Sequence, residues 1–249
     1  KNMIPFYIYY SMFGFQRVGD FIWAAADMRV RGFLIGATSG RTTLAGEGLQ
    51  HQDGHSLLAA SVVPNLKAYD PAYSYELAVI IQDGLKQMYH DGKDIFYYIT
   101  VQNENYSHPD MPENTQEGII KGLYCIQEAK PDMPKVRLLG SGSLLREAKA
   151  AAELLEKDWN ITSEIWSVTS YSELRKESEN IRRWNTLHPN KKQKTCWLNQ
   201  NLGDCSSPII AVSDYVKLVS EQIAAYTPCS FSALGTDGFG RSDNRESLR

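Results

Sequence analysis

The sequence has few cysteines, no long apolar run and no excess of one charge. Its four cysteines include no Cys-x-x-Cys pair and no metal-binding spacing, so we expect reduced thiols and no structural metal. They are Cys125, Cys196, Cys205 and Cys229. The longest nearly apolar run, residues 4–15, is interrupted by Ser11 and Gly14 and is shorter than the roughly 20 residues that a membrane-spanning helix needs. We therefore expect no membrane partner.

The charge balance excludes further classes of partner. The 26 Lys and Arg residues against 29 Asp and Glu residues leave a net charge of -3, with the two signs mixed. A protein that binds nucleic acid or anionic membranes would show a basic excess. No small-residue cleavage site follows the apolar run, so no secretory signal is expected. The sequence predicts a cytoplasmic protein that binds no nucleic acid, and it leaves a neutral or small anionic ligand open.

Apolar segments alternate with amphipathic ones, which predicts an α/β fold with mainly parallel sheets flanked by helices. With 43% hydrophobic residues, the chain can bury a sizeable core. The expected strands are residues 5–10, which we predict to be buried, 32–36, 66–69, 95–100, 136–140, 164–169 and 208–212. The expected helices are residues 15–25, 73–89, 143–157, 172–187 and 213–226.

The composition changes once along the chain, at residues 102–116. Polar residues and prolines crowd this segment, and it contains almost nothing apolar. We interpret it as a linker between two domains, residues 1–101 and residues 117–249.

Two common motifs fail on inspection. The segment Gly140 to Leu145 has two glycines of the dinucleotide fingerprint and lacks the third. His51 and His55 stand four residues apart, as in a helical zinc pair. Gln52 replaces the Glu that such a site uses, and flanking glycines disfavour a helix. Neither a dinucleotide nor zinc is expected.

A loop punctuated by glycines, residues 46–55, follows the second expected strand and carries two His, one Glu and one Asp. Loops at the carboxyl ends of parallel strands are where α/β folds bind ligands. From the residues alone, two interpretations remain open. The loop binds a ligand, or it is a solvated loop whose His and Glu side chains cap neighbouring helices.

Longer sequence strings help to decide between these two interpretations of the loop. They are Tyr9-Tyr10-Ser11-Met12-Phe13-Gly14-Phe15-Gln16-Arg17, Arg31-Gly32-Phe33-Leu34-Ile35-Gly36, residues 38–44, residues 46–55 and residues 234–243. With them, the chain closely resembles the homodimeric pyruvate dehydrogenase E1 component along its whole length. The resemblance implies two thiamine-enzyme-type domains: the back part of a middle, pyrimidine-binding domain and most of a C-terminal, transketolase-like domain.

The resemblance also implies an activity. Enzymes of this family decarboxylate pyruvate on thiamine diphosphate and reductively acetylate the lipoyl groups of dihydrolipoyl acetyltransferase (E2), as homodimers. The Gly-Asp-Gly motif with a distal Asn, which holds the diphosphate and Mg²⁺ in this superfamily, is absent from the sequence. We therefore expect the Mg²⁺ ligands and the cofactor-activating Glu to lie outside these residues. The chain is then a fragment that binds the cofactor poorly and is inactive alone.

The same resemblance assigns site residues. Tyr10 and Phe13 are expected to line the aminopyrimidine pocket, and Arg17 to support it. Glu47 is expected to face the active centre as a catalytic and cofactor-binding group, and Tyr10 to share in catalysis. His51 is expected to act as the acid or hydrogen-bond donor in acetyl transfer.

Neighbouring polar residues receive structural roles. Asp53 and His55 are expected to order the loop, and Asp237 and Arg241 to be structural. Two rival functions stay open. One is another thiamine enzyme such as a transketolase, and the other is a noncatalytic α/β interaction fragment.

Overall fold

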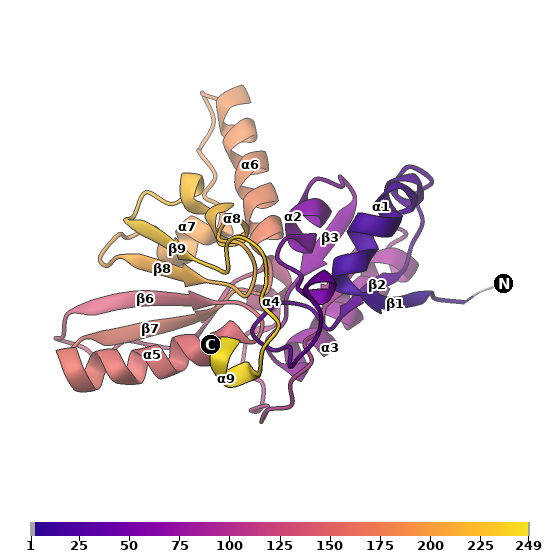
Figure 1. Ribbon diagram of the computed structural model, residues 1–249. Helices are drawn as coiled ribbons and strands as arrows, with labels where there is room; N and C mark the ends of the chain where they lie inside the picture. The colour runs from indigo at the N-terminus through magenta and orange to yellow at the C-terminus, as the bar shows by residue number, and fades with distance from the viewer. Residues whose placement is uncertain (1–2, 249) are drawn as a thin grey trace.

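Residues 3–248 of the chain are described by a computed structural model (Figure 1). Lys1, Asn2 and Arg249, which the expected domain limits include, lie outside the described residues. Two α/β units lie side by side, each built on one sheet with helices packed against it. This architecture confirms the predicted fold class. No helix within residues 3–248 is long and apolar enough to cross a membrane.

The first unit contains a parallel four-stranded sheet with the order β1-β2-β4-β3. Its strands are β1 (Phe6–Tyr10), β2 (Phe33–Ala37), β3 (Leu66–Tyr69) and β4 (Phe96–Thr100). Its helical segments are α1 (Ser11–Asp27), the 3-10 turn η1 (Leu49–His51), α2 (Ser56–Ser61), α3 (Ser74–Leu85) and the π-helical turn η2 (Lys86–His90). The central strand β4 is buried along its whole length, as expected for a parallel sheet covered on both faces.

The strand expected over residues 5–10 is confirmed at Phe6–Tyr10, but the expectation that it is buried is wrong. These residues form the edge strand β1, and Phe6, Tyr7 and Ile8 are 47%, 56% and 66% exposed. Aromatic and β-branched content favours a strand, but it does not tell what covers that strand. Here β1 pairs only with β2, so its free edge and much of its side-chain surface face solvent.

The second unit contains a five-stranded sheet with the order β5-β7-β6-β8-β9. Its strands are β5 (Tyr124–Gln127), β6 (Lys135–Gly140), β7 (Thr162–Ser167), β8 (Ile209–Val212) and β9 (Phe231–Leu234). Only β5 pairs in the antiparallel sense. Its helical segments are α4 (Gln116–Lys121), α5 (Leu144–Trp159), α6 (Tyr171–Leu187), α7 (Trp197–Leu202), α8 (Leu218–Glu221), the 3-10 turn η3 (Ala224–Tyr226) and α9 (Arg245–Leu248).

The helix expected over residues 213–226 is also partly wrong. Only the short α8 and η3 are helical, and residues 213–217 are not. The backbone there bonds to other parts of the chain, because Val216 N donates to Gly54 O and Tyr215 O accepts from Thr236 N. These tertiary bonds take the place of the helical ones.

The sequence predicts that all four cysteines are reduced thiols. This prediction is wrong for two of them. Cys205 and Cys229 form a disulfide, with their Cα atoms 4.8 Å apart. The turn after α7 and the segment before β9 meet beside β8, so the pair is close in space although it is separated by 24 positions. Cys125 and Cys196 are free.

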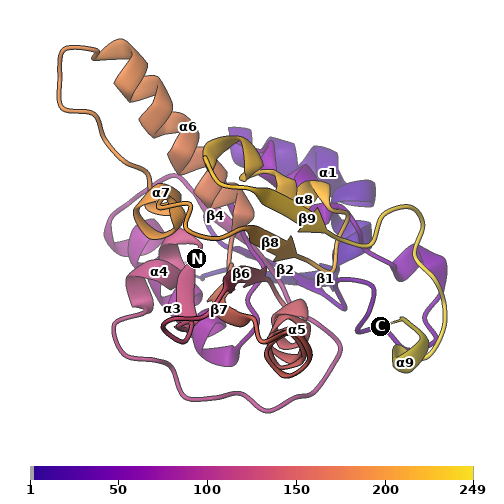
Figure 2. The same cartoon turned by 90° about the vertical axis from the view of Figure 1, so that its left-hand side faces the viewer.

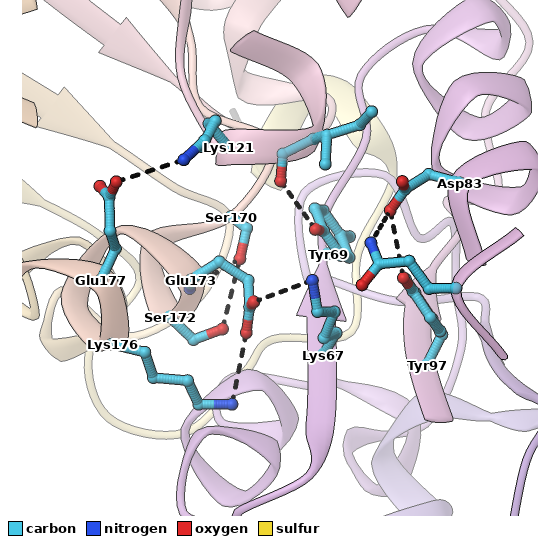
Figure 3. Close-up of polar contacts among 12 residues, drawn as sticks. Lys67, Tyr69, Asp83, Tyr97, Lys121, Ser170, Ser172, Glu173, Lys176 and Glu177 are labelled. Atoms are coloured by element: carbon cyan, nitrogen blue, oxygen red, sulfur yellow. Dashed lines mark hydrogen bonds and ion pairs between the residues drawn. The ribbon is translucent and has the colours of Figure 1, made fainter. Parts of the chain in front are cut away.

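The two units share a polar seam, part of which Figure 3 shows. Lys67 on β3 pairs with Glu173 on α6 at 3.7 Å, and Tyr69 Oη donates to Ile120 O at 2.8 Å. Ser170 Oγ, just before α6, donates to Ala68 O at 2.6 Å. The carboxyl end of β3 is therefore tied to the start of α6, which fixes one unit against the other.

Candidate functional site

Four of the five predicted site residues come together at the carboxyl ends of β1 and β2. Tyr10 and His51 stack with ring centroids 4.9 Å apart, and the edge of Phe13 meets His51 at 5.2 Å. The guanidinium carbon of Arg17 lies 4.0 Å from the centroid of Phe13. We call Tyr10, Phe13, Arg17 and His51 the ring cluster.

The local sequence explains how the ring cluster forms. Strand β1 ends at Tyr10 and α1 begins at the next residue, so Phe13 and Arg17, four positions apart, share one face of the first helical turns. Gly14 makes this sharp entry possible, because a Cβ there would overlap the ring of Tyr9. The 3-10 turn η1 then brings His51 from the glycine loop against these rings.

His51 has a free hydrogen-bonding atom. Its Nδ1 is buried and has no hydrogen-bond partner among residues 3–248. A buried imidazole nitrogen without a partner is costly in an apolar site unless a ligand or water satisfies it. The ring cluster therefore combines aromatic faces with an unpaired nitrogen, as a flat polar heterocycle would require.

The fifth predicted residue, Glu47, lies elsewhere in the loop. Its carboxylate accepts from Ala45 N and from Asn103 Nδ2, the latter at 3.1 Å. Asn103 O in turn accepts from the guanidinium of Arg245 in α9. Within the described part of the chain, no ring or hydrogen-bond contact joins Glu47 to the ring cluster.

The loop-ordering role predicted for Asp53 is confirmed. Asp53 Oδ1 accepts from His55 N at 3.1 Å and from Ser56 N at 2.9 Å, which caps the start of α2. His55 Nε2 lies 3.0 Å from Gln16 Nε2 on α1. Asp237 likewise has a structural contact, because its Oδ1 accepts from Lys217 N at 3.0 Å.

Sequence analysis missed a residue of the second unit that binds the segment after β2. Asp214, after β8, accepts from the backbone N–H groups of Arg41 and Thr42 at 2.9 and 3.0 Å. Gly40 has a positive φ of 78°, and a Cβ there would overlap the Asp214 carboxylate. Burial raises the pKa of Asp214 to about 7. No local pattern marks this contact, because its partners lie 173 positions apart.

Two more buried carboxylates lie at the seam. Asp70, at the end of β3, accepts from Thr100 Oγ1 at 2.6 Å and Gln102 Nε2 at 2.9 Å, and burial raises its pKa to about 6. Glu76 on α3 accepts from Tyr124 Oη and Ser167 Oγ, both at 2.6 Å. Burial also raises the pKa of Glu76.

These acids do not form a metal site. Within residues 3–248, no group of three or more His, Cys, Asp or Glu side chains could hold a metal ion. The described residues therefore offer no metal site of this kind, whereas the aromatic faces of the ring cluster suit a flat heterocycle.

Comparison with known proteins identifies the family. The model of the pyruvate dehydrogenase E1 component middle domain matches residues 1–109, and that of the transketolase-like C-terminal domain matches residues 122–249. The pyruvate dehydrogenase E1 component of Pseudomonas aeruginosa is 56% identical over 251 residues, which cover 100% of this chain and 28% of the relative. The Escherichia coli K12 protein of the same name is 54% identical, over 99% of this chain and 28% of that protein. The chain belongs to the pyruvate dehydrogenase E1 family.

Solved structures confirm the transketolase-like fold. A transketolase from Campylobacter jejuni superposes with a TM-score of 0.74 at 19% identity, over 99% of this chain and 33% of that one. A split-gene transketolase gives 0.67 at 15% identity, over 98% of this chain and 70% of that one. At such identities the likeness shows the fold alone. The E1 family depends on thiamine, and the chain spans about 28% of the length of its curated E1 relatives.

Proposed function

We propose that this chain is the part of a pyruvate dehydrogenase E1 component that holds the aminopyrimidine end of thiamine diphosphate. The complete protein would decarboxylate pyruvate oxidatively and pass the acetyl group to lipoyl groups of E2. The observation that carries the proposal is the ring cluster, in which His51 lies against Tyr10 and Phe13 at 4.9 and 5.2 Å. The E1 relatives at 54–56% identity support it over the transketolase and noncatalytic alternatives.

The ring cluster suits the cofactor's aminopyrimidine. Phe13 offers an aromatic face, and Arg17 above it stabilises the position of that ring by a cation–π contact. Tyr10, 48% exposed, provides a second face and a hydroxyl for polar contact. When bound, thiamine diphosphate supplies the nucleophilic carbon and the electron sink for decarboxylation of a 2-oxo acid. The Mg²⁺ ligands for its diphosphate would come from residues outside this chain.

His51 is the group that we propose to move a proton. An imidazole can accept a proton on one ring nitrogen and donate one from the other, so it suits a proton-transfer role. Its buried Nδ1 has no partner among residues 3–248 and is free to serve a bound reactant. We assign it the role of acid or donor in acetyl transfer to the lipoyl group.

Glu47 we assign to the edge of the same site. Its bonds with Ala45 N and Asn103 hold the glycine loop between the ring cluster and the second unit. A hydrogen-bonding carboxylate in this loop can contact a cofactor or reactant bound at the ring cluster. This role rests on the family resemblance and on the loop's position.

A homodimer is part of the proposal. Large apolar side chains are exposed along β1 and α1, a surface that we call the apolar flank. Its members include Phe6, Tyr7, Ile8, Phe21 and Trp23, with exposures from 47% to 73%. An apolar hollow of about 380 Å³ lies between β1 and α1 within this flank. Exposed apolar patches of this kind mark protein interfaces.

We also propose a cytoplasmic location, which the mixed charge and low cysteine content support. Thiol-reducing systems of the cytoplasm would act against the Cys205–Cys229 disulfide. Pyruvate and the lipoyl domains of E2 are the proposed substrate and partner, and neither nucleic acid nor membrane is included.

The test is His51→Ala in the full-length protein that carries this chain. We expect overall activity with pyruvate and E2 to fall about 10²-fold, as for a lost acid–base group, while single-turnover decarboxylation and cofactor affinity change little. His55→Ala is the matched control, since His55 lies in the same loop and contacts Gln16 instead of the rings. Equal losses in decarboxylation and acetyl transfer would contradict the assignment. Turnover of sugar phosphates in place of pyruvate would favour a transketolase.

A further inference from the structure

One stretch of the second unit departs from the mixed charge of the chain. Between Glu179 and Asp204 there is no acidic residue, yet five basic residues occur. They are Arg182, Arg183, Lys191, Lys192 and Lys194. The rest of the chain carries 21 basic residues against 29 acidic ones, so positive charge is concentrated here. We call these five residues the basic tip.

The basic tip lies at the far end of α6. This helix starts at the seam and projects from the body of the molecule, and the loop that follows Leu187 returns from its end to α7 (Figures 1 and 2). All five basic side chains are exposed. No carboxylate within residues 3–248 lies at ion-pair distance from any of them. Their charge is therefore open to a partner.

The tip is held in place by its own contacts. Asn185 on α6 bonds twice to Lys194, through Nδ2 to the carbonyl and through Oδ1 to the N–H, both at 2.9 Å. The ammonium of Lys194 lies 4.1 Å from the centroid of Trp184, and His188 stacks on the same Trp184 at 4.5 Å. A loop ordered in this way loses little conformational entropy when a partner binds.

A hollow of about 510 Å³ opens beside the tip. Two of the basic residues, Arg182 and Lys194, line it together with Asn185, Gln193 and Tyr226. Cations next to amide groups suit a carboxylate, which accepts charge-assisted hydrogen bonds.

The arrangement also distinguishes between kinds of anion. Arg183, Lys191 and Lys192 are not among the residues that line the hollow, so one small anion would leave them unpaired. A bound single-stranded nucleic acid would stack its bases on open aromatic faces. The rings at this site are already covered, Trp184 by Lys194 and His188, and Tyr226 by Arg182 at 4.9 Å. An extended acidic peptide fits both the hollow and the outer cations.

We propose that the basic tip docks a carboxylate-rich segment of a partner protein, with one acidic side chain in the hollow and its neighbours on the outer lysines. This surface lies on the second unit, whereas the ring cluster belongs to the first. It is therefore independent of the chemistry proposed above.

The experiment uses the full-length protein and a fluorescein-labelled peptide of twelve glutamates, followed by fluorescence anisotropy at 50 and 200 mM NaCl. We expect binding at low salt that weakens at high salt, because the contacts are between exposed charges. Lys191→Glu with Lys192→Glu should weaken binding about tenfold or more. The control, Lys86→Glu with Lys157→Glu, changes the net charge equally at exposed positions elsewhere and should weaken binding about twofold at most.

The other possible results of this experiment would also support or overturn the proposed docking site. Equal losses in the two double variants would show a general charge effect and overturn the proposal, as would a wild-type protein that does not bind the peptide. Tighter binding of a twelve-nucleotide oligo-dT than of the glutamate peptide would assign the surface to nucleic acid. Unchanged pyruvate decarboxylation in both double variants is expected and would show that the protein remains folded.

Discussion

The seam between the two units and the apolar flank reverse the usual placement of polar and apolar groups. At the seam, Asp70, Glu76 and Asp214 are buried carboxylates. On the flank, Phe21 and Trp23 are large apolar side chains that are 73% and 53% exposed. A buried carboxylate is tolerated where hydrogen bonds satisfy it, and an exposed apolar patch is tolerated where a partner covers it. Within residues 3–248, the carboxylate oxygens of these three residues accept hydrogen bonds, except Asp70 Oδ2, whereas the apolar flank would be covered only in the homodimer proposed above.

The contrast between the seam and the apolar flank is tested first at Glu76 in the seam, where we expect the largest loss of stability. Glu76→Ala would leave Tyr124 Oη, Ser167 Oγ and two backbone N–H groups without their acceptor. We expect the free energy of unfolding to fall by about 3–5 kcal/mol, as for a buried charged group removed from its partners. Chemical denaturation of the full-length protein measures the loss. Glu153→Ala on the exposed face of α5 is the control and should change stability by less than about 0.5 kcal/mol.

The second prediction concerns pH at Asp70. Burial raises its native pKa from 3.8 to about 6, so the folded protein binds more protons than the unfolded chain between these values. Stability from this group is therefore lost as pH rises through that window. Asp70→Asn removes the titration, keeps an acceptor oxygen for Thr100 and Gln102, and places an amide where Oδ2 has no partner among residues 3–248.

Relative to the wild type, Asp70→Asn should gain on the order of 3 kcal/mol of stability between pH 4 and pH 7. Melting temperatures measured across this range check the difference, because contributions from groups that the Asp70 charge does not influence cancel between the two proteins. Asp214 is the exception, since the charge of Asp70 helps to raise its pKa. Asp53, whose charge also acts on Asp70, is unchanged in both. The exposed Asp158→Asn gives the reference slope. Parallel profiles for Asp70→Asn and the wild type would contradict the prediction.

The smallest effect is expected on the flank. Phe21→Glu places a charge on a surface that we propose to be buried between subunits, so the dimer should dissociate about tenfold more readily, or about 1.4 kcal/mol. Sedimentation velocity of the full-length protein over a range of concentrations measures this. Trp159→Glu at the end of α5 is the control, since that side chain is equally exposed at 73% but lies on the second unit. An unchanged dimer in both variants would show that the flank is not the interface.

Some of the site could be predicted from sequence and some could not. Tyr10, Phe13 and His51 belong to strings carried on a strand end, the helix after it and the next strand's loop. Because the carboxyl ends of parallel strands share one edge of the sheet, their meeting follows from the topology. Glu47 follows the same argument only in part, because its carboxylate bonds to Asn103 instead of the rings.

The remaining features depend on contacts between distant residues. Asp214 accepts a hydrogen bond from the backbone N–H of Arg41, which is 173 positions away in the sequence. The disulfide-bonded pair Cys205 and Cys229 has no characteristic spacing. Strands β5 and β9 are not among the expected strands, although β3 and β8, which are also four residues long, are. Sequence patterns report local preference and one-sided burial, whereas these features depend on residues that are distant in the sequence and adjacent only in the folded chain.

The hydrogen bonds between the second unit and the segment that leads from β2 into the glycine loop have a consequence for biosynthesis. Asp214 binds the backbone at Arg41 and Thr42, and Arg245 donates to Thr43 O at 2.6 Å. Translation proceeds from the first unit to the second, and domains fold in that order as they emerge. The ribosome must therefore synthesise the chain as far as Asp214 and Arg245 before the segment that leads to His51 can form these hydrogen bonds. A nascent chain stalled before residue 214 would lack the contacts that Asp214 makes with Arg41 and Thr42.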